Sequence, residues 1–186
     1  MKTKLLGAAL ALATVCSAQT AVYGHNNKYL LPDRKITPGA VNPAIIADPS
    51  GKSVFLDGAE ANICAKGFTV EPYKKVTEAT KLQICEEYGE KDCSNPAKGA
   101  INYLVPLEIG GKDTIDNIWW QPASDYKVKS QFELKLRPMV CSGKFSLSQA
   151  QSLMQHNWVV GMWVTQSVEK CDHCTVTTVP TIKLPN

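Results

Sequence analysis

The sequence lacks a hydrophobic run of membrane-spanning length. The apolar stretch from Leu5 to Val15 is far below the ~20 residues that cross a bilayer as a helix. It follows the charged start Met1–Lys4 and precedes a small-residue cleavage site at Ala18, which is the order of a secretory leader. We therefore expect a signal peptide over residues 1–18, no membrane span after its removal, and export to the periplasm or the medium.

Internal repeats, low-complexity tracts and long polar linkers are also missing. About 168 residues remain after the expected leader, which is enough for one domain with its own core and too few for two. Residues 19–57 are rich in proline, glycine and asparagine, and are expected to form an extended N-terminal arm. We expect the domain itself over residues 58–165 and a C-terminal tail over residues 166–186.

A surplus of one charge sign is lacking as well. The formal net charge is +3, and removal of Lys2 and Lys4 with the leader leaves 18 basic against 17 acidic side chains. Nucleic-acid binders usually carry a clearly basic domain or patch. Only residues 112–144 are locally basic, with six positive and four negative side chains, and we interpret them as an ordinary solvated surface.

Cysteines, in contrast, are plentiful. Cys16 lies in the expected leader, so six of the seven cysteines remain, and an even number in an exported protein indicates up to three disulfides. Six cysteines allow 15 pairings. The set that we favour is Cys64–Cys141, Cys85–Cys93 and Cys171–Cys174. A redox site or a zinc site at Cys171–Cys174 is disfavoured, because neither a βαβ surround nor a second ligand pair is evident.

Local patterns predict a helix-rich α+β domain. Helices are expected over 77–88, capped by Thr77 with Leu82, Cys85 and Tyr88 on its inner face, and over 125–139, stopped by Pro138. A third helix is expected to begin after Ser146, which forms a capping-box pattern with Gln149, and to bury Leu147, Ala150, Met154 and Trp158. Apolar runs at 101–107 and 118–120 predict two strands joined through a Gly-Gly turn.

The order strand, turn, strand, helix between Ile101 and Met139 is a ββα motif, which places two strand side chains and one helix side chain around one metal. The residues that make up this motif are more specific: Leu104-Val105-Pro106-Leu107-Glu108-Ile109-Gly110-Gly111, then Asn117-Ile118-Trp119 and Gln121-Pro122. This resembles a small exported bacterial branch of the HNH endonuclease superfamily, whose string runs Asp-His-Leu-Ile-Pro-Leu-Glu-Leu-Gly-Gly and continues to Asn-Leu-Trp-Pro-Gln-Pro. The resemblance spans Lys35 to Trp158 and also favours the pairing of Cys64 with Cys141.

Three polar positions depart from that family pattern. The family's metal-binding Asp and its general-base His are replaced by Asn102 and Tyr103, and an Asp of the helix is replaced by Ser130. A tyrosine of pKa about 10 is only about 0.1% deprotonated at pH 7, whereas a histidine of pKa about 6.5 is largely basic there. Loss of a positioned base typically costs 10²–10⁴ in rate. Neutral Asn102 and Ser130 also bind magnesium more weakly than carboxylates do.

Other side chains near the motif could take part in the same chemistry. Glu108 and Glu133 could hold a cation weakly, but structural hydrogen bonds are the favoured interpretation of both. Asn117 is expected to pin the loop between the strands through its amide, although it also occupies a position of the degenerate site. The tryptophans Trp119, Trp120 and Trp158 are interpreted first as core and second as a platform for stacking bases.

Three functions follow from these patterns. The first is a non-catalytic binding module for nucleic acid or for a protein partner, for which no cofactor is expected. The second is an active endonuclease with a rearranged centre, which would need Mg²⁺ or Mn²⁺ and would use Tyr103 with Glu108 or Glu133. The third is an inert structural protein of the cell envelope. The sequence does not decide between partners or indicate an oligomeric state.

Overall fold

The computed structural model describes residues 29–170 and shows a small α+β domain, as predicted. Its elements are the hairpin β1 (Phe55–Leu56) and β2 (Ala59–Glu60), helix α1 (Glu78–Glu87), the hairpin β3 (Gly99–Tyr103) and β4 (Ile118–Pro122), and helices α2 (Ala123–Cys141) and α3 (Leu147–Glu169). Three 3₁₀ turns, η1 (Glu71–Tyr73), η2 (Leu107–Ile109) and η3 (Ile115–Asn117), connect them. The expected leader and the expected Cys171–Cys174 bond lie outside the described residues.

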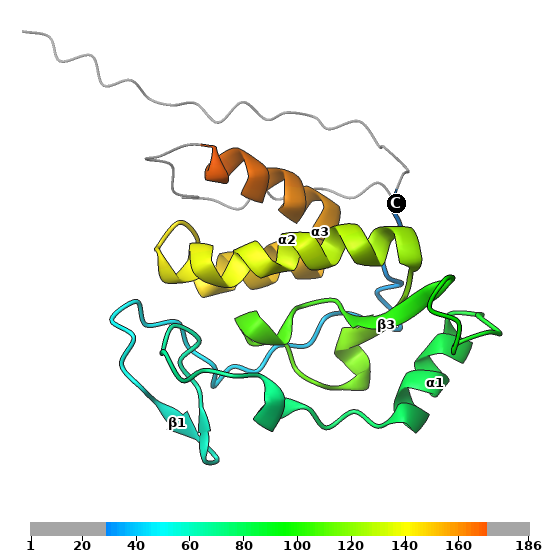
Figure 1. The fold of residues 1–186 in the computed structure, drawn as a ribbon, viewed down its shortest axis with the longest axis horizontal. Coiled ribbons are helices and arrows are strands. Elements are labelled where there is room, and N and C mark those ends of the chain that lie inside the picture. Colours follow the sequence, from blue (N-terminus) through cyan, green and yellow to red (C-terminus); the bar gives the residue numbers. More distant parts are fainter. Residues whose placement is uncertain (1–28, 171–186) are drawn as a thin grey trace, which may run out of the picture.

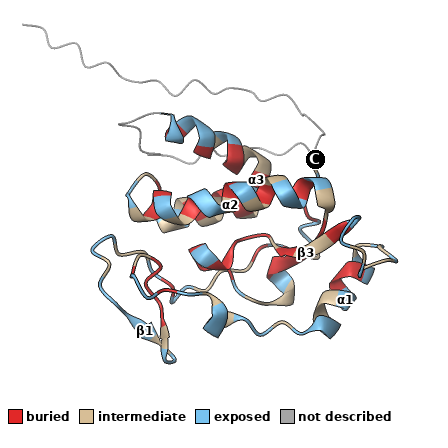
Figure 2. Ribbon diagram, in the orientation of Figure 1, coloured by how far each residue is buried: buried red, intermediate tan, exposed pale blue. Residues whose placement is uncertain are grey.

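The β3–β4 hairpin is the centre of the arrangement. Helix α2 packs across it, α3 packs against α2, and α1 contacts both strands from below in the view of Figure 1. Buried residues lie where these elements meet (Figure 2), and Trp119 and Trp158 are among the largest of them, in agreement with their core interpretation. Within the described residues, no helix combines the length and the apolarity needed to cross a bilayer.

Strand β3 is shorter than the predicted run of 101–107. It is antiparallel to β4, with Asn102 opposite Trp119 and Tyr103 opposite Ile118, and it ends at Tyr103. Val105 is bonded to the side chain of Asn117 in place of a strand neighbour, with its amide 2.9 Å from Asn117 Oδ1. Pro106 has no amide hydrogen to continue a ladder. The chain therefore turns into η2 instead of extending the strand.

Two helical predictions need correction. Thr77 does cap α1, accepting from the Thr80 amide at 3.2 Å, but Leu82 is 51% exposed and the inner face is formed by Ile84 and Cys85. Helix α2 does not stop at Pro138 but continues to Cys141. A proline there removes only the bond to the carbonyl four residues earlier, that of Leu134, which lies on the solvent side of the helix.

Helix α3 begins as predicted and then breaks. Its capping box between Ser146 and Gln149 is confirmed, and Ala150, Met154 and Trp158 are buried while Leu147 is only partly so. At Asn157 the backbone leaves the helical region, with φ −167° and ψ 98°. The Asn157 Oδ1 accepts from the amides of Val159 and Val160 at 3.1 Å each, so it caps a second helical segment.

The N-terminal segment is bonded to α2 and α3. The Leu30 amide donates to Asp125 Oδ2 at 2.7 Å, and the indole of Trp158 donates to the Leu30 carbonyl at 3.0 Å. Further along, Thr37 and Ile45 are buried. The arm predicted over residues 19–57 thus contributes core residues from its described part.

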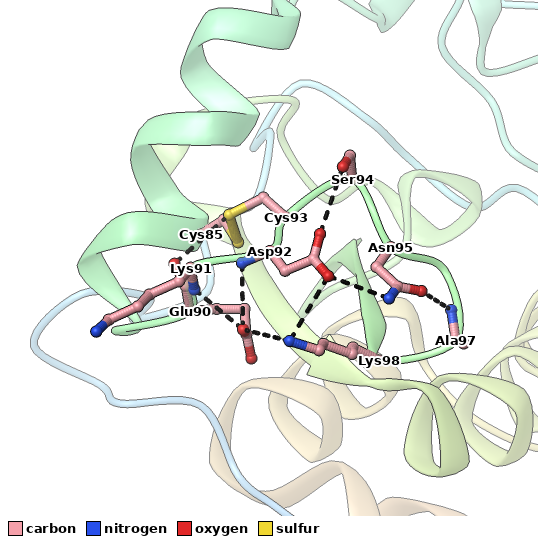
Figure 3. Close-up of polar contacts among 9 residues, drawn as sticks. All are labelled: Cys85, Glu90, Lys91, Asp92, Cys93, Ser94, Asn95, Ala97 and Lys98. Carbon is pink, nitrogen blue, oxygen red and sulfur yellow. Dashed lines mark hydrogen bonds and ion pairs between the residues drawn. A yellow bond between two sulfur atoms is a disulfide. The ribbon is translucent and has the colours of Figure 1, made fainter.

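Both disulfides expected among the described residues are confirmed, Cys64–Cys141 and Cys85–Cys93. The second closes the turn after α1 (Figure 3), where the ammonium of Lys98 lies 3.8 Å from Glu90 and 3.6 Å from Asp92. The two bonds span very different lengths of chain, with sequence separations of 77 and 8 residues.

We expect the longer disulfide to stabilise the protein more. Closing a loop restricts the unfolded chain, and the chain-entropy relation gives about 4.5 kcal/mol for the Cys64–Cys141 bond and about 2.5 kcal/mol for Cys85–Cys93. Paired Cys→Ser variants of each bond should show these losses in the free energy of unfolding, measured by urea titration without reductant. Equal losses from the two pairs would contradict this expectation.

Candidate functional site

The end of β3 and the facing side of α2 bring together several of the residues singled out in the sequence. Asn102 is 9% exposed, and its Nδ2 donates to Gln121 Oε1 at 2.9 Å. Its Oδ1 accepts from the Tyr103 amide at 2.8 Å, and its side chain also acts as a hydrogen-bond donor to Glu133. Both ends of the carboxamide are therefore already used by the protein.

Tyr103 points away from Asn102, because successive side chains of a strand face opposite sides. Its hydroxyl donates to Asp113 Oδ1 at 2.8 Å, and Asp113 Oδ2 accepts from the backbone amides of Lys75 and Val76. Burial and this bond to Asp113 raise the pKa of the Tyr103 phenol far above its ordinary value. The phenol is thus a held hydrogen-bond donor, which ties the segment before α1 to the end of β3.

A buried ion pair lies on the other side of β3. The Lys129 side chain is fully buried, and its Nζ donates to the Tyr103 carbonyl at 2.5 Å and to Glu133 Oε1 one helical turn away. Burial lowers the pKa of Lys129 and raises the pKa of Glu133, while the charge of each partner acts in the opposite direction. The structural hydrogen bond expected of Glu133 is therefore present.

Glu108 and Ser130 are not joined to this network. Glu108 is exposed on η2 and makes no hydrogen bond within residues 29–170, contrary to the expectation for it, although its charge raises the pKa of Lys129 and of Glu133. Ser130 is partly buried on α2 and likewise has no partner among the described residues.

Asn117 holds the loop between the strands, as expected. Its Oδ1 accepts from the Val105 amide at 2.9 Å, and its Nδ2 donates to the carbonyls of Val105 and Lys112, each at 2.8 Å. The side chain is fully buried. Backbone groups of the loop therefore bond to both the oxygen and the nitrogen of the Asn117 carboxamide, which gives this side chain a structural role.

The polar centre formed by Asn102, Gln121, Lys129 and Glu133 has few side chains that could bind a metal ion. Across the described part of the chain, no three His, Cys, Asp or Glu side chains gather closely enough to hold a cation. The centre instead contains two buried N–H groups that have no hydrogen-bond acceptor, Gln121 Nε2 and Trp119 Nε1. The arrangement fixes hydrogen bonds and one ion pair, and Glu133, whose pKa is raised by burial, is the carboxylate held within it.

Three members of this centre were not predicted as site residues from the sequence: Lys129, Gln121 and Asp113. Gln121 could have been found, because it lies two residues after Trp119 on β4 and so shares the face of Asn102. Asp113 could not, because its partners Lys75 and Val76 are 38 and 37 residues away in the chain and no local pattern links them.

Tyr103→Phe is expected to lower the free energy of unfolding by about 1 kcal/mol, because it leaves the Asp113 carboxylate without the phenol donor. Amide exchange of Lys75 and Val76 should also become faster. Tyr126→Phe is the matched control, because Tyr126 is 40% exposed and its hydroxyl has no partner within the described residues. A loss no larger than that of the control would contradict the role of the phenol in joining these segments.

Lys129→Met is expected to destabilise the protein by about 3 kcal/mol at neutral pH, because it leaves the Glu133 carboxylate without its ammonium. Burial raises the pKa of Glu133 in the folded state above its unfolded value. The carboxyl is then neutral in the folded variant at acid pH, so stability falls as pH rises from the ordinary carboxyl range through the raised value.

Urea midpoints between pH 4 and pH 8 measure this effect. The double variant Lys129→Met/Glu133→Gln should recover most of the loss and remove its pH dependence. A single variant whose stability relative to the unmodified protein does not change with pH would exclude this account of the pair.

Comparison of this chain with protein-family models, with curated proteins and with solved structures gave no significant match. The function of this protein must therefore be inferred from the polar centre between β3, β4 and α2.

Proposed function

We propose that this is an exported protein with an HNH-nuclease-like scaffold that no longer hydrolyses phosphodiesters and acts as a binding module. The observation that carries the proposal is the state of Tyr103, which occupies the position of the family's general base. Its hydroxyl donates to Asp113, and its pKa is raised. A general base must accept a proton near neutral pH. This phenol keeps its own proton instead.

The charge of Lys129 supports the same conclusion for the metal. A divalent cation beside Asn102 and Glu133 would lie close to a buried ammonium that is already paired with Glu133. Like charges in a poorly solvated site repel strongly. Asn102 offers no compensating negative charge, and its amide is occupied by Gln121. Binding of Mg²⁺ or Mn²⁺ is therefore opposed by both charge and hydrogen bonding.

A protein is a better partner than a nucleic acid on charge grounds. After the expected leader, 18 basic side chains are balanced by 17 acidic ones, which gives little attraction for phosphates. Exposed apolar side chains are present instead, including Leu30 at 58% and Phe55 at 69% exposure. The two disulfides and the expected leader support export to an oxidising compartment.

The test is a plasmid-nicking assay with the oxidised protein in Mg²⁺ and in Mn²⁺. We expect no cleavage from the unmodified chain, and metal-dependent nicking from the triple variant Asn102→Asp/Tyr103→His/Ser130→Asp, which returns the missing base and carboxylates. A matched triple with Tyr103→Phe in place of Tyr103→His carries the same carboxylates without the base, and should be slower by about 10²–10⁴.

Nicking by the unmodified protein that disappears in Tyr103→Phe would overturn the proposal and favour an active rearranged centre. Binding assays then distinguish a nucleic-acid partner from a protein partner. A gel shift that weakens steeply with salt would indicate a nucleic-acid partner.

A further inference from the structure

Strand β1 has one edge that no other segment of the described chain covers. Its inner edge pairs with β2, and just before β1 the Ala61 amide donates to the Val54 carbonyl. Hydrogen-bonded and non-hydrogen-bonded pairs alternate along an antiparallel ladder, so the amide and the carbonyl of Phe55 point away from β2. Within residues 29–170, no other segment bonds to the backbone of Phe55. A free donor and a free acceptor therefore lie side by side at the outer edge of β1.

The other side of this hairpin is already occupied. The Ala61 carbonyl accepts from the Ile46 amide at 3.0 Å, and the Glu60 carbonyl accepts from the Tyr73 hydroxyl at 2.9 Å. Figure 1 shows the hairpin at the lower left periphery of the molecule, away from α1 and α3. Strand β1 is therefore the side at which this two-stranded sheet can accept another strand.

The free edge is held in a fixed conformation. Asp57 and Gly58 have φ of 49° and 79°, the positive values that a tight hairpin turn of type I′ requires. The Glu60 carboxylate accepts from the amides of Val54 and Asn62 at 2.8 and 3.0 Å, which fixes the chain on both strands. A strand that is ordered in advance loses less conformational entropy when another strand pairs with it.

The side chains along this edge are apolar in the middle and charged at the ends. Phe55 is 69% exposed and Val54 39% exposed, while Leu56 is partly buried. Lys52 precedes this apolar run and Asp57 follows it, and both are exposed without an ion pair within residues 29–170. A parallel strand of the same sequence would bring like charges together, whereas an antiparallel one brings lysine to aspartate. The charge pattern thus complements a second copy of β1 in the antiparallel direction.

We propose that β1 pairs antiparallel with β1 of a second copy of this chain, with Phe55 on the two-fold axis. The two Phe55 residues then exchange both backbone hydrogen bonds, and Val54 of each copy lies opposite Leu56 of the other. Lys52 comes within one residue of the position opposite Asp57. Aromatic and aliphatic cross-strand pairs stabilise such a contact. A two-fold contact closes on itself, so the product is a dimer and not a fibre.

This inference goes beyond the proposed binding role and does not depend on it. The edge of β1 shares no residue with the polar centre formed by Asn102, Gln121, Lys129 and Glu133. The outcome of the nicking assay therefore has no bearing on the dimer, and the dimer has none on hydrolysis.

The test is self-association of the full oxidised protein, followed by chemical shifts and sedimentation equilibrium between about 20 µM and 2 mM, a range suited to weak contacts. We expect a dimer with a Kd on the order of 0.1–1 mM, because two paired hairpins bury less than the ~1,200 Å² of stable interfaces. The concentration-dependent shifts should centre on residues 52–57. A protein that stays monomeric throughout this range overturns the proposal.

The register is tested by an isotope-filtered nuclear Overhauser experiment on a mixture of labelled and unlabelled chains. Residues of a non-hydrogen-bonded antiparallel pair approach closely, with α-carbons about 4.5 Å apart. We expect a contact between the α-protons of Val54 in one copy and Leu56 in the other. A dimer that lacks this contact uses another surface or another register, which contradicts the proposal.

Matched variants test the apolar and the charged parts of the edge. Phe55→Ser should weaken the dimer at least about tenfold, whereas Leu134→Ser, at a more exposed apolar side chain on α2, should leave it unchanged. Lys52→Glu places like charges together at both ends of the contact and should weaken it at least about fivefold. Lys127→Glu makes the same change of net charge on α2 and should have no such effect. Equal effects of a variant and its control would show that β1 is not the contact.

Discussion

The requirement to satisfy one buried positive charge organises the centre of this protein. Lys129 has no access to water, so its ammonium must be bonded by the protein itself. It bonds to the Tyr103 carbonyl and to Glu133, and Glu133 in turn accepts from Asn102. One side chain thereby fixes α2 against the end of β3 and aligns the carboxamide beside it. The positive charge at the polar centre is therefore the ammonium of Lys129.

The second constraint is that hydrogen bonds from side chains replace backbone hydrogen bonds between strands where the β3–β4 hairpin ends. Asn117 supplies to Val105 the partners that a longer strand would have supplied, and Asp113 binds Tyr103 together with the segment before α1. Such substitutions let a hairpin end abruptly without leaving buried backbone groups unpaired. They also bring residues distant in the chain together, because Asp113 joins the segment before α1 to the end of the five-residue strand β3.

The features that the sequence predicted correctly depend mainly on interactions between residues close together in the chain. The cap at Thr77, the capping box at Ser146 and the order of strands and helix follow from interactions within a few residues, and an even cysteine count together with the resemblance led to both disulfides. The break at Asn157 was not predicted, because its Oδ1 caps either a helix start or a turn and only tertiary packing selects between them. The bond between Tyr103 and Asp113 depends on loop closure that no short pattern encodes.

The Cys64–Cys141 disulfide has a topological consequence. Together with the backbone it forms a covalent ring that contains β3, β4, all of α2 and every residue of the polar centre. A protease that cuts this ring once opens it without separating the pieces, because the sulfur bridge still joins them. Two cuts within the ring are needed to release a fragment, and Cys85–Cys93 forms a smaller ring within the same interval. The part of the molecule that carries the centre is therefore protected by connectivity as well as by packing.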